Sequence, residues 1–359
     1  MKMLVSFLAL LMAGVSISAQ TQPQSHMRRA IEQNGGFMQG GMNHQVATGV
    51  LLDQRLDAAS HIITLRIGPM NLPANTSHMK MPQPTDLTWT IPLTGWLLSY
   101  HPRLVDASGN TVPGTVLHHV AFWNENRSDF LCPSKEEHIF GAGGELTDWA
   151  SVPGFGYRVQ KGDRIRVETM IHNPTPTAYE KAYLEIAVQY LDDASPAPVK
   201  NFYPAWMDVA VCGNSSYDLP PGLSEKSGTV GVKFDGILLG VGGHMHDYAK
   251  QIALENLTGK QTIATLQAKT DDKGHLQYMP VVTFYATGGQ KLAAGDQLKI
   301  TATYDNTTGK LLRQGAMGIV VGYFVPANDS QFAQFRHAAK IPQHDMHDMK
   351  DMPHMSHDQ

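Results

Sequence analysis

Short runs of β-branched and aromatic residues alternate with Gly-, Pro-, Asn- and Asp-rich turns from His61 to Val325. The 33 glycines and 21 prolines supply these turns, and no helical period of useful length competes with the runs. This spacing is typical of a pair of β-sandwiches, so we expect an all-β chain with two consecutive antiparallel β-sandwich domains. The runs predict strands over residues 61–67, 94–105, 116–123, 164–171, 182–191, 228–234, 237–241, 251–256, 281–285, 297–304 and 317–325.

The predicted strands contain an internal repeat with an offset of 133 residues. Each copy has a Gly-Asp turn, a strand, an Asn-x-Thr turn and a second strand. Similarity at a fixed offset indicates two related domains, although two independent hairpins would give the same pattern. We expect domains over residues 60–195 and 199–327, joined by an Asp-, Ser- and Pro-rich linker. The aligned identities are Gly162 with Gly295, Asp163 with Asp296, Asn173 with Asn306, Thr175 with Thr308, Ile186 with Ile319, Val188 with Val321 and Tyr190 with Tyr323.

Residues 1–19 have the form of a secretory signal. One cation, Lys2, precedes an apolar run, and small residues follow up to Ala19. The alternative, a short membrane anchor, conflicts with the length of the run, because a membrane-spanning helix needs about 20 residues. We expect an exported protein, periplasmic or secreted, without a membrane span. Residues 20–59, rich in Gln, Gly and Met, are expected to be a flexible lead-in.

Residues 328–359 are expected to form a disordered tail rich in His and Met. A solvated tail without a metal would have the same composition of polar residues. However, flexible imidazoles and thioethers can gather around a soft ion, and thioethers favour Cu(I). The tail is therefore a candidate copper-collecting segment. Its candidate ligands are His344, Met346, His347, Met349, His354, Met355 and His357.

The composition of the whole chain also favours metal chemistry over nucleic-acid binding. The chain has 17 His and 18 Met beside only 2 Cys, which points to imidazole and thioether ligands. Its formal charge is −4, from 28 Lys and Arg against 32 Asp and Glu, so no basic surface for nucleic acid is expected.

Two pairs of histidines are candidate metal ligands. His118 and His119 are adjacent at the start of an apolar strand, where neighbouring side chains point to opposite faces. Both therefore reach one ion only if the strand bends there or if different ring nitrogens bind. His244 and His246 are separated by one residue, so on an extended strand they share a face and can chelate one ion. The alternative for each pair is a set of strand histidines without a metal.

Each copy of the repeat adds one further candidate. His172 ends a predicted strand of the first copy, and Met317 begins one of the second. Taken alone, His172 would be a hydrogen-bonded histidine at a strand end, and Met317 would fill a core.

Taken together, these positions resemble the copper type II, ascorbate-dependent monooxygenases, the family of peptidylglycine α-hydroxylating monooxygenase and dopamine β-monooxygenase. The resemblance covers about residues 61–325. It rests on short motifs in the family's order: His118-His119, Trp149-Ala150, residues 153–159, His172, His244-Met245-His246 with Lys250, and Met317 with its strand through Tyr323.

The resemblance implies two jelly-roll domains that each present one copper ion to a shared, solvent-filled cleft. In the family, ascorbate supplies electrons, and O₂ is used to hydroxylate a C–H bond of the substrate. Three imidazoles support both oxidation states of copper, whereas a thioether favours Cu(I). By position, the electron-storing copper would take His118, His119 and His172, and the catalytic, oxygen-binding copper would take His244, His246 and Met317.

The chain also departs from the family. The peptide-hydroxylating branch holds its substrate's carboxylate with an arginine, and this chain has Gly242 at that position. The branch also has polar residues just beyond the methionine, where this chain has Ile319 and Val321. A peptide ending in glycine is therefore not the expected substrate. Only Cys132 and Cys212 are present, whereas the animal enzymes have many disulfides. Export would permit these two cysteines to pair, but their spacing leaves open whether they pair or stay free.

Three other functions fit parts of the sequence. The tail and the missing substrate anchors favour a non-catalytic copper-binding or copper-handling protein on the same scaffold. A pair of β-sandwiches that binds carbohydrate or protein would not need six ligands in the family's order. A hydrolytic zinc site would not use methionine. We therefore expect an exported copper-dependent monooxygenase with two copper ions, which acts on an unidentified small molecule with O₂ and a reductant such as ascorbate.

Overall fold

The computed structural model describes residues 46–85, 87–144, 149–195 and 199–339. The predicted signal, residues 20–45 of the predicted lead-in and the candidate ligands of the tail lie outside this part. Within it, 23 strands and four short 3₁₀ helices confirm a nearly all-β chain, in several largely antiparallel sheets, none of which closes. No helix of the described ranges is long and apolar enough to cross a membrane.

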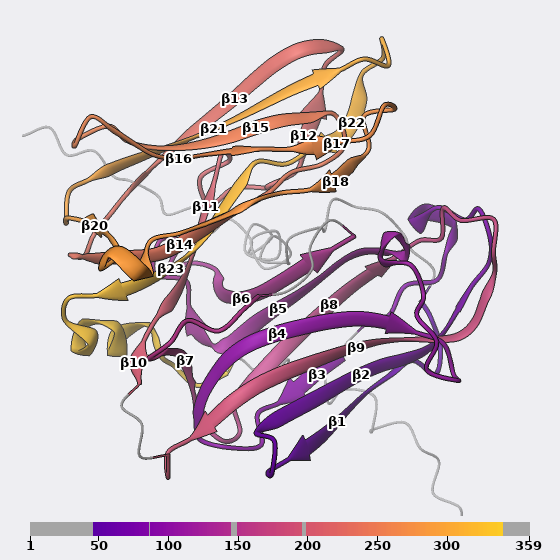
Figure 1. The fold of residues 1–359 in the computed structure, drawn as a ribbon, viewed down its shortest axis with the longest axis horizontal. Helices are drawn as coiled ribbons and strands as arrows, with labels where there is room; N and C mark the ends of the chain where they lie inside the picture. The colour runs from indigo at the N-terminus through magenta and orange to yellow at the C-terminus, as the bar shows by residue number, and fades with distance from the viewer. Residues whose placement is uncertain (1–45, 86, 145–148, 196–198, 340–359) are drawn as a thin grey trace, which may run out of the picture. The chain divides into compact units, whose positions relative to one another are not determined.

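Two sheets are built mainly from strands that precede residue 195 (Figure 1). All their pairs are antiparallel except the short pair of β10 with β7. The six-stranded sheet has the order β1 (Leu51–Asp57), β2 (Ile62–Leu72), β9 (Tyr179–Asp192), β4 (Gly95–Val105), β7 (Phe155–Val159), β10 (Lys200–Asn201). The four-stranded sheet has the order β3 (Leu87–Thr90), β8 (Arg164–Ile171), β5 (Leu117–Ser128), β6 (Glu136–Gly143).

The later strands form two further main sheets and two small ones. One main sheet has the order β11 (Tyr203–Asp208), β23 (Ile319–Pro326), β14 (Gly236–His244), β19 (Val281–Thr283), with β20 (Gln290–Leu292) also on β14. The other has the order β13 (Gly222–Gly231), β21 (Gln297–Asn306), β15 (Ala249–Asn256), β16 (Gln261–Gln267). The small sheets pair β12 (Tyr217–Leu219) with β22 (Leu312–Ala316) and β17 (Lys269–Thr270) with β18 (Leu276–Tyr278). The 3₁₀ helices are η1 (His78–Lys80), η2 (Gly114–Val116), η3 (Tyr285–Thr287) and η4 (Asp329–Phe335).

Every strand predicted from the sequence overlaps an observed strand, with three local differences. β1 lies inside the range expected to be a lead-in; its residues are mostly exposed, so they show no apolar alternation. The strand predicted over 281–285 ends at Thr283, because Tyr285 begins η3. Met317 lies between β22 and β23 and does not begin a strand, because its backbone bonds to a tyrosine hydroxyl and not to a neighbouring strand.

Alternate residues of the strands are buried between the sheets, as the sequence pattern predicts. In the first pair of sheets, Leu65 of β2 and Phe122 of β5 belong to one apolar core and are fully buried. In the second pair, Ile252 of β15 and Leu238 of β14 belong to another. Each pair of sheets therefore encloses a core to which both of its sheets contribute.

The repeat seen in the sequence has a structural counterpart in its turns. The Asn173 side-chain oxygen accepts hydrogen bonds from the N–H and hydroxyl of Thr175, at 3.0 and 2.7 Å. Asn306 accepts the same two bonds from Thr308, at 3.1 and 2.7 Å. Both aspartates of the Gly-Asp turns accept the backbone N–H three residues earlier, at 2.8 and 2.9 Å. The two copies therefore share one hydrogen-bond pattern at both of these turns.

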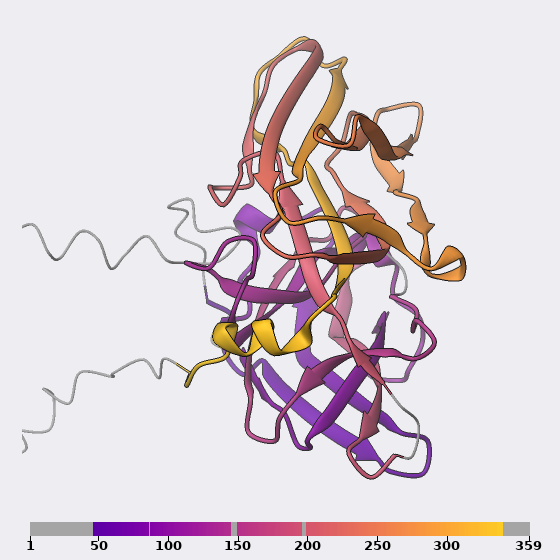
Figure 2. The ribbon, with the colours of Figure 1, turned by 90° about the vertical axis from the view of Figure 1, so that its left-hand side faces the viewer.

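Covalent and ionic contacts connect the two pairs of sheets. Cys132, beyond β5, and Cys212, beyond β11, form a disulfide, which answers the question that their spacing left open. η4, the yellow coil in Figure 2, lies inside the range expected to be a disordered tail. It is ordered because Phe332 is buried in the second core. Arg336, which follows η4, then forms an ion pair with Asp163 of the first copy of the repeat, at 2.5 Å.

Candidate metal centre

A bulge in β5 brings the rings of His118 and His119 together. In the pairing of β5 with β8, Leu117 lies opposite Ile171 and His119 lies opposite Met170, so His118 is an extra residue. The ring centroids of the two histidines are 5.3 Å apart. On a regular strand these side chains would point to opposite faces. The bulge therefore supplies the bend that adjacent histidines need if they are to share one ion.

His172 directly follows β8 and reaches the same place. Its backbone N–H donates to the carbonyl of Val116, and its ring hydrogen-bonds to the backbone of Thr115 in η2. The next residue, Asn173, fixes the chain through its Asn-x-Thr turn. The ring of His172 consequently lies 5.2 Å from that of His118, centroid to centroid.

The second pair of histidines lies at the end of β14. His244 is the last residue of the strand, and Met245 beyond it is 1% exposed in the second core. Because Met245 occupies the inner face, its neighbours His244 and His246 take the other one. Their ring centroids are 5.6 Å apart. The two rings therefore lie close together, with His246 beyond the end of β14.

One buried hydroxyl joins His246 to Met317. The hydroxyl oxygen of Tyr304, on β21, accepts the backbone N–H of His246 at 2.9 Å and that of Met317 at 3.2 Å. The same hydroxyl donates to the carbonyl of Met317. Burial raises the pKa of Tyr304 well above its usual value, so the hydroxyl keeps its proton. Tyr304 therefore fixes the spacing of two loops that each carry a candidate ligand.

The candidate ligands of the two predicted sites meet at His118. The ring centroid of His118 is 6.4 Å from that of His246, so the two groups are in contact across the pairs of sheets. The imidazoles that the sequence assigns to two copper sites therefore lie next to each other. We call this group the histidine cluster; its members are His118, His119, His172, His244 and His246.

The chemical types of the donors in the histidine cluster suit copper, whereas the arrangement of their rings does not form a site. Imidazoles that bind one ion through bonds of about 2.0–2.1 Å have centroids roughly 5 Å apart, close to the separations of His118 from His119 and His172. Imidazole and thioether are also the donors that copper accepts. However, among residues 46–85, 87–144, 149–195 and 199–339, no three His, Cys, Asp or Glu side chains are arranged to hold one ion. The structure gathers the donors without making them converge.

Burial keeps the central imidazoles neutral. It lowers the pKa of His118 far below the usual value, and the neighbouring histidines lower the pKa further. Burial also lowers the pKa of His172, against the opposing influence of the Thr115 backbone and the Asp247 carboxylate. Neutral imidazole is the form that binds a metal. The Asp247 carboxylate itself accepts the N–H of Leu276 at 2.9 Å.

Two histidines beside the cluster were not identified from the sequence. His78, on η1, has its ring centroid 4.9 Å from that of His118. His138, on β6, is stacked between the rings of Trp123 and Trp206, at 4.0 and 3.5 Å. Burial lowers the pKa of His138 well below its usual value, and nearby Arg166, His244 and His119 lower it further. Neither residue has a second histidine at ligand spacing, so no local pattern signals them.

The positions that lack the family's substrate anchors form an apolar wall. Ile319 and Val321 are 1% and 9% exposed and pack with Met317 against Trp206. Gly242 lies opposite Val321 in the sheet. A Cβ atom at Gly242 would meet only one atom within 4 Å, at 3.4 Å, so packing does not demand glycine there.

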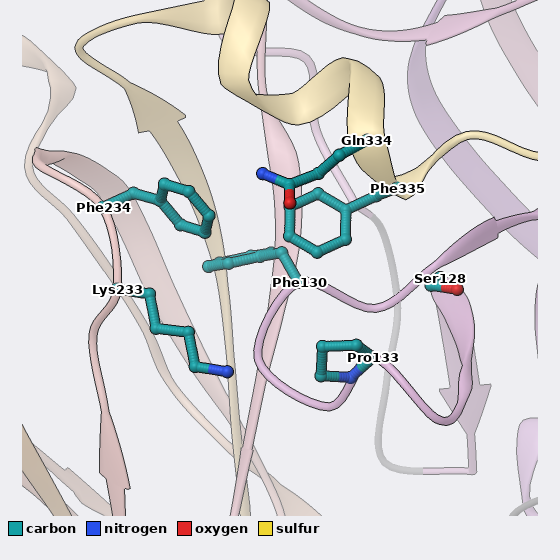
Figure 3. Close-up of a pocket in the computed structure, with 7 residues that line it drawn as sticks. All are labelled: Ser128, Phe130, Pro133, Lys233, Phe234, Gln334 and Phe335. Atoms are coloured by element: carbon teal, nitrogen blue, oxygen red, sulfur yellow. The ribbon is translucent and has the colours of Figure 1, made fainter.

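A cavity of about 340 Å³ has no member of the histidine cluster in its lining. It is lined by Phe130, Phe234 and Phe335 together with Lys233 (Figure 3). No histidine lines it, nor does any lie in a second cavity of about 130 Å³ beside Val152 and Phe155. Neither cavity is part of the candidate metal centre.

The fold and the cluster together define a β-sheet protein with a copper-type set of donors. No protein-family model matches the chain. A protein of Phoma sp. (strain ATCC 20986 / MF5453), named "Probable copper-dependent oxygenase M1", is 26% identical over 238 residues, which are 59% of this chain and 58% of that protein. A protein of Cochliobolus lunatus, named "Probable copper-dependent oxygenase clz3", is 26% identical over 240 residues, 59% of this chain and 72% of that protein. The chain thus matches little more than half the length of the Phoma protein.

Two solved structures align with this chain at low similarity. The major capsid protein P2 of bacteriophage PM2 aligns with 78% of this chain and 97% of its own, at 11% identity and a TM-score of 0.32. The PBCV-1 protein VP54 aligns with 79% and 96%, at 7% identity and a TM-score of 0.23. Scores this low support no conclusion about fold or function.

Proposed function

We propose that this chain is an exported copper-dependent oxygenase that hydroxylates a C–H bond of an unidentified small substrate with O₂ and a reductant such as ascorbate. The observation that carries the proposal is the meeting of His118, His172 and His246, which come from three distant segments of the sequence. The names of the two fungal relatives support the same class. Membership of the ascorbate-dependent monooxygenases, with jelly-roll domains over residues 60–195 and 199–327, rests on the order of the motifs and is part of the proposal.

Two copper ions per chain follow from the donor sets. When bound, copper supplies one-electron chemistry with O₂ and with the reductant. The thioether of the second set favours Cu(I), the state that reacts with O₂. One ion would be held by His118, His119 and His172, and the other by His244, His246 and Met317.

The chain itself would contribute neutral ligands, fixed spacing and exclusion of water. Because His118 and His172 have low pKa values, they bind a metal without first losing a proton. The hydroxyl of Tyr304 holds the loops of the second set in register. The buried side chains of Ile319 and Val321 keep water away from Met317.

The same wall restricts the substrate. With Gly242 in place of an arginine and apolar side chains at positions 319 and 321, no cation or polar pair at these positions would hold a carboxylate. We therefore propose a substrate that does not depend on a terminal carboxylate for binding.

Export and copper collection complete the proposal. The disulfide between Cys132 and Cys212 supports an oxidising compartment, since such bonds form and persist in the periplasm or outside the cell. The signal-like residues 1–19 point the same way. The His- and Met-rich residues 342–359 would collect copper for the main sites without taking part in turnover.

The test is O₂ uptake by the copper-loaded protein with ascorbate and a panel of small substrates. His246→Ala removes one ligand of the second set, and we expect substrate-dependent uptake to fall by more than about 100-fold. Mutation of residues that only hydrogen-bond to metal ligands already lowers activity by up to about 100-fold. His275→Ala is the matched control, because His275 is exposed and pairs with Asp271. Full uptake by His246→Ala would refute the assignment.

A non-catalytic copper-handling protein is the alternative. The observation in its favour is the apolar wall, which lacks the family's substrate anchors. On this alternative, the protein binds copper through the same ligands, and His246→Ala loses copper. No substrate of the panel, however, would raise O₂ uptake by the copper-loaded unmodified protein above the uptake caused by the same amount of free copper.

A further inference from the structure

His78 is held at the histidine cluster by a buried amide. The side-chain nitrogen of Gln83, 4% exposed as a residue, lies 3.1 Å from the carbonyl oxygen of His78 and 2.9 Å from that of Ile171. The Gln83 side-chain oxygen accepts the N–H of Ile171 at 2.8 Å. Ile171 is the last residue of β8 and immediately precedes His172. One amide therefore ties the segment of His78 to the strand that positions a candidate ligand.

A second set of hydrogen bonds fixes the same two segments. The backbone N–H of Thr76 donates to the carbonyl of Asn173, and the N–H of Asn173 donates back to Thr76, both at 2.8 Å. The N–H of Asn75 donates to the carbonyl of Thr175 at 2.9 Å. His78 follows the paired residues of one segment, and His172 precedes those of the other. Their backbones therefore cannot move apart without breaking these hydrogen bonds.

The ring of His78 is closer to that of His118 than the rings of His119, His172 and His246 are. The centroid separation is 4.9 Å for His78, against 5.2 Å for His172, 5.3 Å for His119 and 6.4 Å for His246. The planes of the His78 and His118 rings differ by 24°, much as those of His172 and His118 differ by 27°. His78 and His172 are therefore both stacked with His118, at similar separations and similar angles.

We propose that His78 is a fourth imidazole ligand of the copper site formed by His118, His119 and His172. This inference rests on the proposed function. Four nitrogen donors suit the tetragonal geometry that Cu(II) prefers, whereas a set with a thioether favours Cu(I). A fourth imidazole would therefore stabilise the oxidised state of this site and widen the difference between the two coppers.

The first test uses the unmodified full-length protein and an acylating reagent for imidazole. A nitrogen that binds copper cannot be acylated by diethyl pyrocarbonate. We expect modification of His78, measured by mass spectrometry of its peptide, to fall at least about tenfold on loading with Cu(II), in parallel with His172. The exposed His275 should be modified equally in both states and serves as the internal control. Equal modification of His78 with and without copper would overturn the inference.

The second test measures retention of Cu(II) against a competing chelator. We expect His78→Ala to weaken retention at the first site at least about tenfold and to change the Cu(II) electron paramagnetic resonance spectrum, whereas His275→Ala does neither. Both variants keep the tail, so its copper cancels in the comparison. If His118→Ala loses copper and His78→Ala does not, this inference fails and the proposed function stands. If neither variant loses copper, the proposed function itself fails.

Discussion

Replacing Tyr304 with phenylalanine removes one oxygen atom and three hydrogen bonds from the second set of ligands. The hydroxyl accepts from the N–H groups of His246 and Met317 and donates to the carbonyl of Met317. Tyr304 is 1% exposed, and Met317 is fully buried. The ring remains in the variant, so packing is preserved, and the effect reports on the hydroxyl alone.

The magnitude follows from the groups left without a partner. A buried polar group that loses its hydrogen bond costs about 1–3 kcal/mol of stability. The N–H and carbonyl of Met317 are both fully buried, whereas the N–H of His246 lies in a partly exposed residue that water can reach. Two fully affected groups and one partly affected group predict a loss of about 3 kcal/mol in the free energy of unfolding.

Urea unfolding measures this loss, and a metal titration measures its consequence. Tyr278→Phe is the matched control: Tyr278 is 40% exposed, so removal of its hydroxyl should change stability by less than about 0.5 kcal/mol. We further expect Tyr304→Phe to weaken copper binding at the second set at least about tenfold, as the loss of other positioning partners does. If the free energy of unfolding of Tyr304→Phe lies within about 0.5 kcal/mol of the wild-type value and its copper affinity is unchanged, this reasoning is refuted.

Two further changes test burial and the thioether. Burial raises the pKa of Asp129 to about 7, above the unfolded value near 3.8. The folded chain therefore holds this proton to higher pH, and its stability falls as pH rises from about 4 to about 7. Asp129→Asn keeps the acceptor for the N–H groups of Leu131 and Cys132. Its free energy of unfolding, relative to that of the wild type, should rise by roughly 3–4 kcal/mol between pH 4 and pH 8. A difference in urea unfolding that does not change with pH would contradict the assignment. Met317→Leu conserves volume, so the free energy of unfolding should change by less than about 1.5 kcal/mol. The Cu(I) affinity of the second set, measured by competition with a Cu(I) chelator, should fall at least about tenfold. An unchanged affinity would mean that the thioether is not a ligand.

The strand pattern and the His-x-His pair could be predicted because both depend on local alternation. Buried and exposed residues alternate in the predicted strands, and His244 and His246 lie on one face because Met245 faces the core. β1 could not be found in this way, because most of its residues are exposed on an edge of the sheet. Local patterns report on burial, and an exposed edge strand has little of it.

The geometry at His118 and His78 depends on contacts between distant residues. The bulge that brings His118 beside His119 arises from the register of β5 against β8 and has no signal in the sequence of either strand. His78 reaches the cluster through Gln83, whose partner Ile171 lies 88 residues away. A lone histidine in a short turn gives no reason to expect this contact. The sequence therefore predicts candidate ligands but not the whole set around His118.

The central claim is that the chain carries two copper sites built from the histidine cluster and Met317. The most direct measurement is copper per chain, by elemental analysis, on mature protein that lacks residues 342–359, because loose ligands in this segment would add to the count. We predict two copper ions per chain, and one in the His244→Ala/His246→Ala double variant. No retained copper, or an unchanged count in the double variant, would contradict the account.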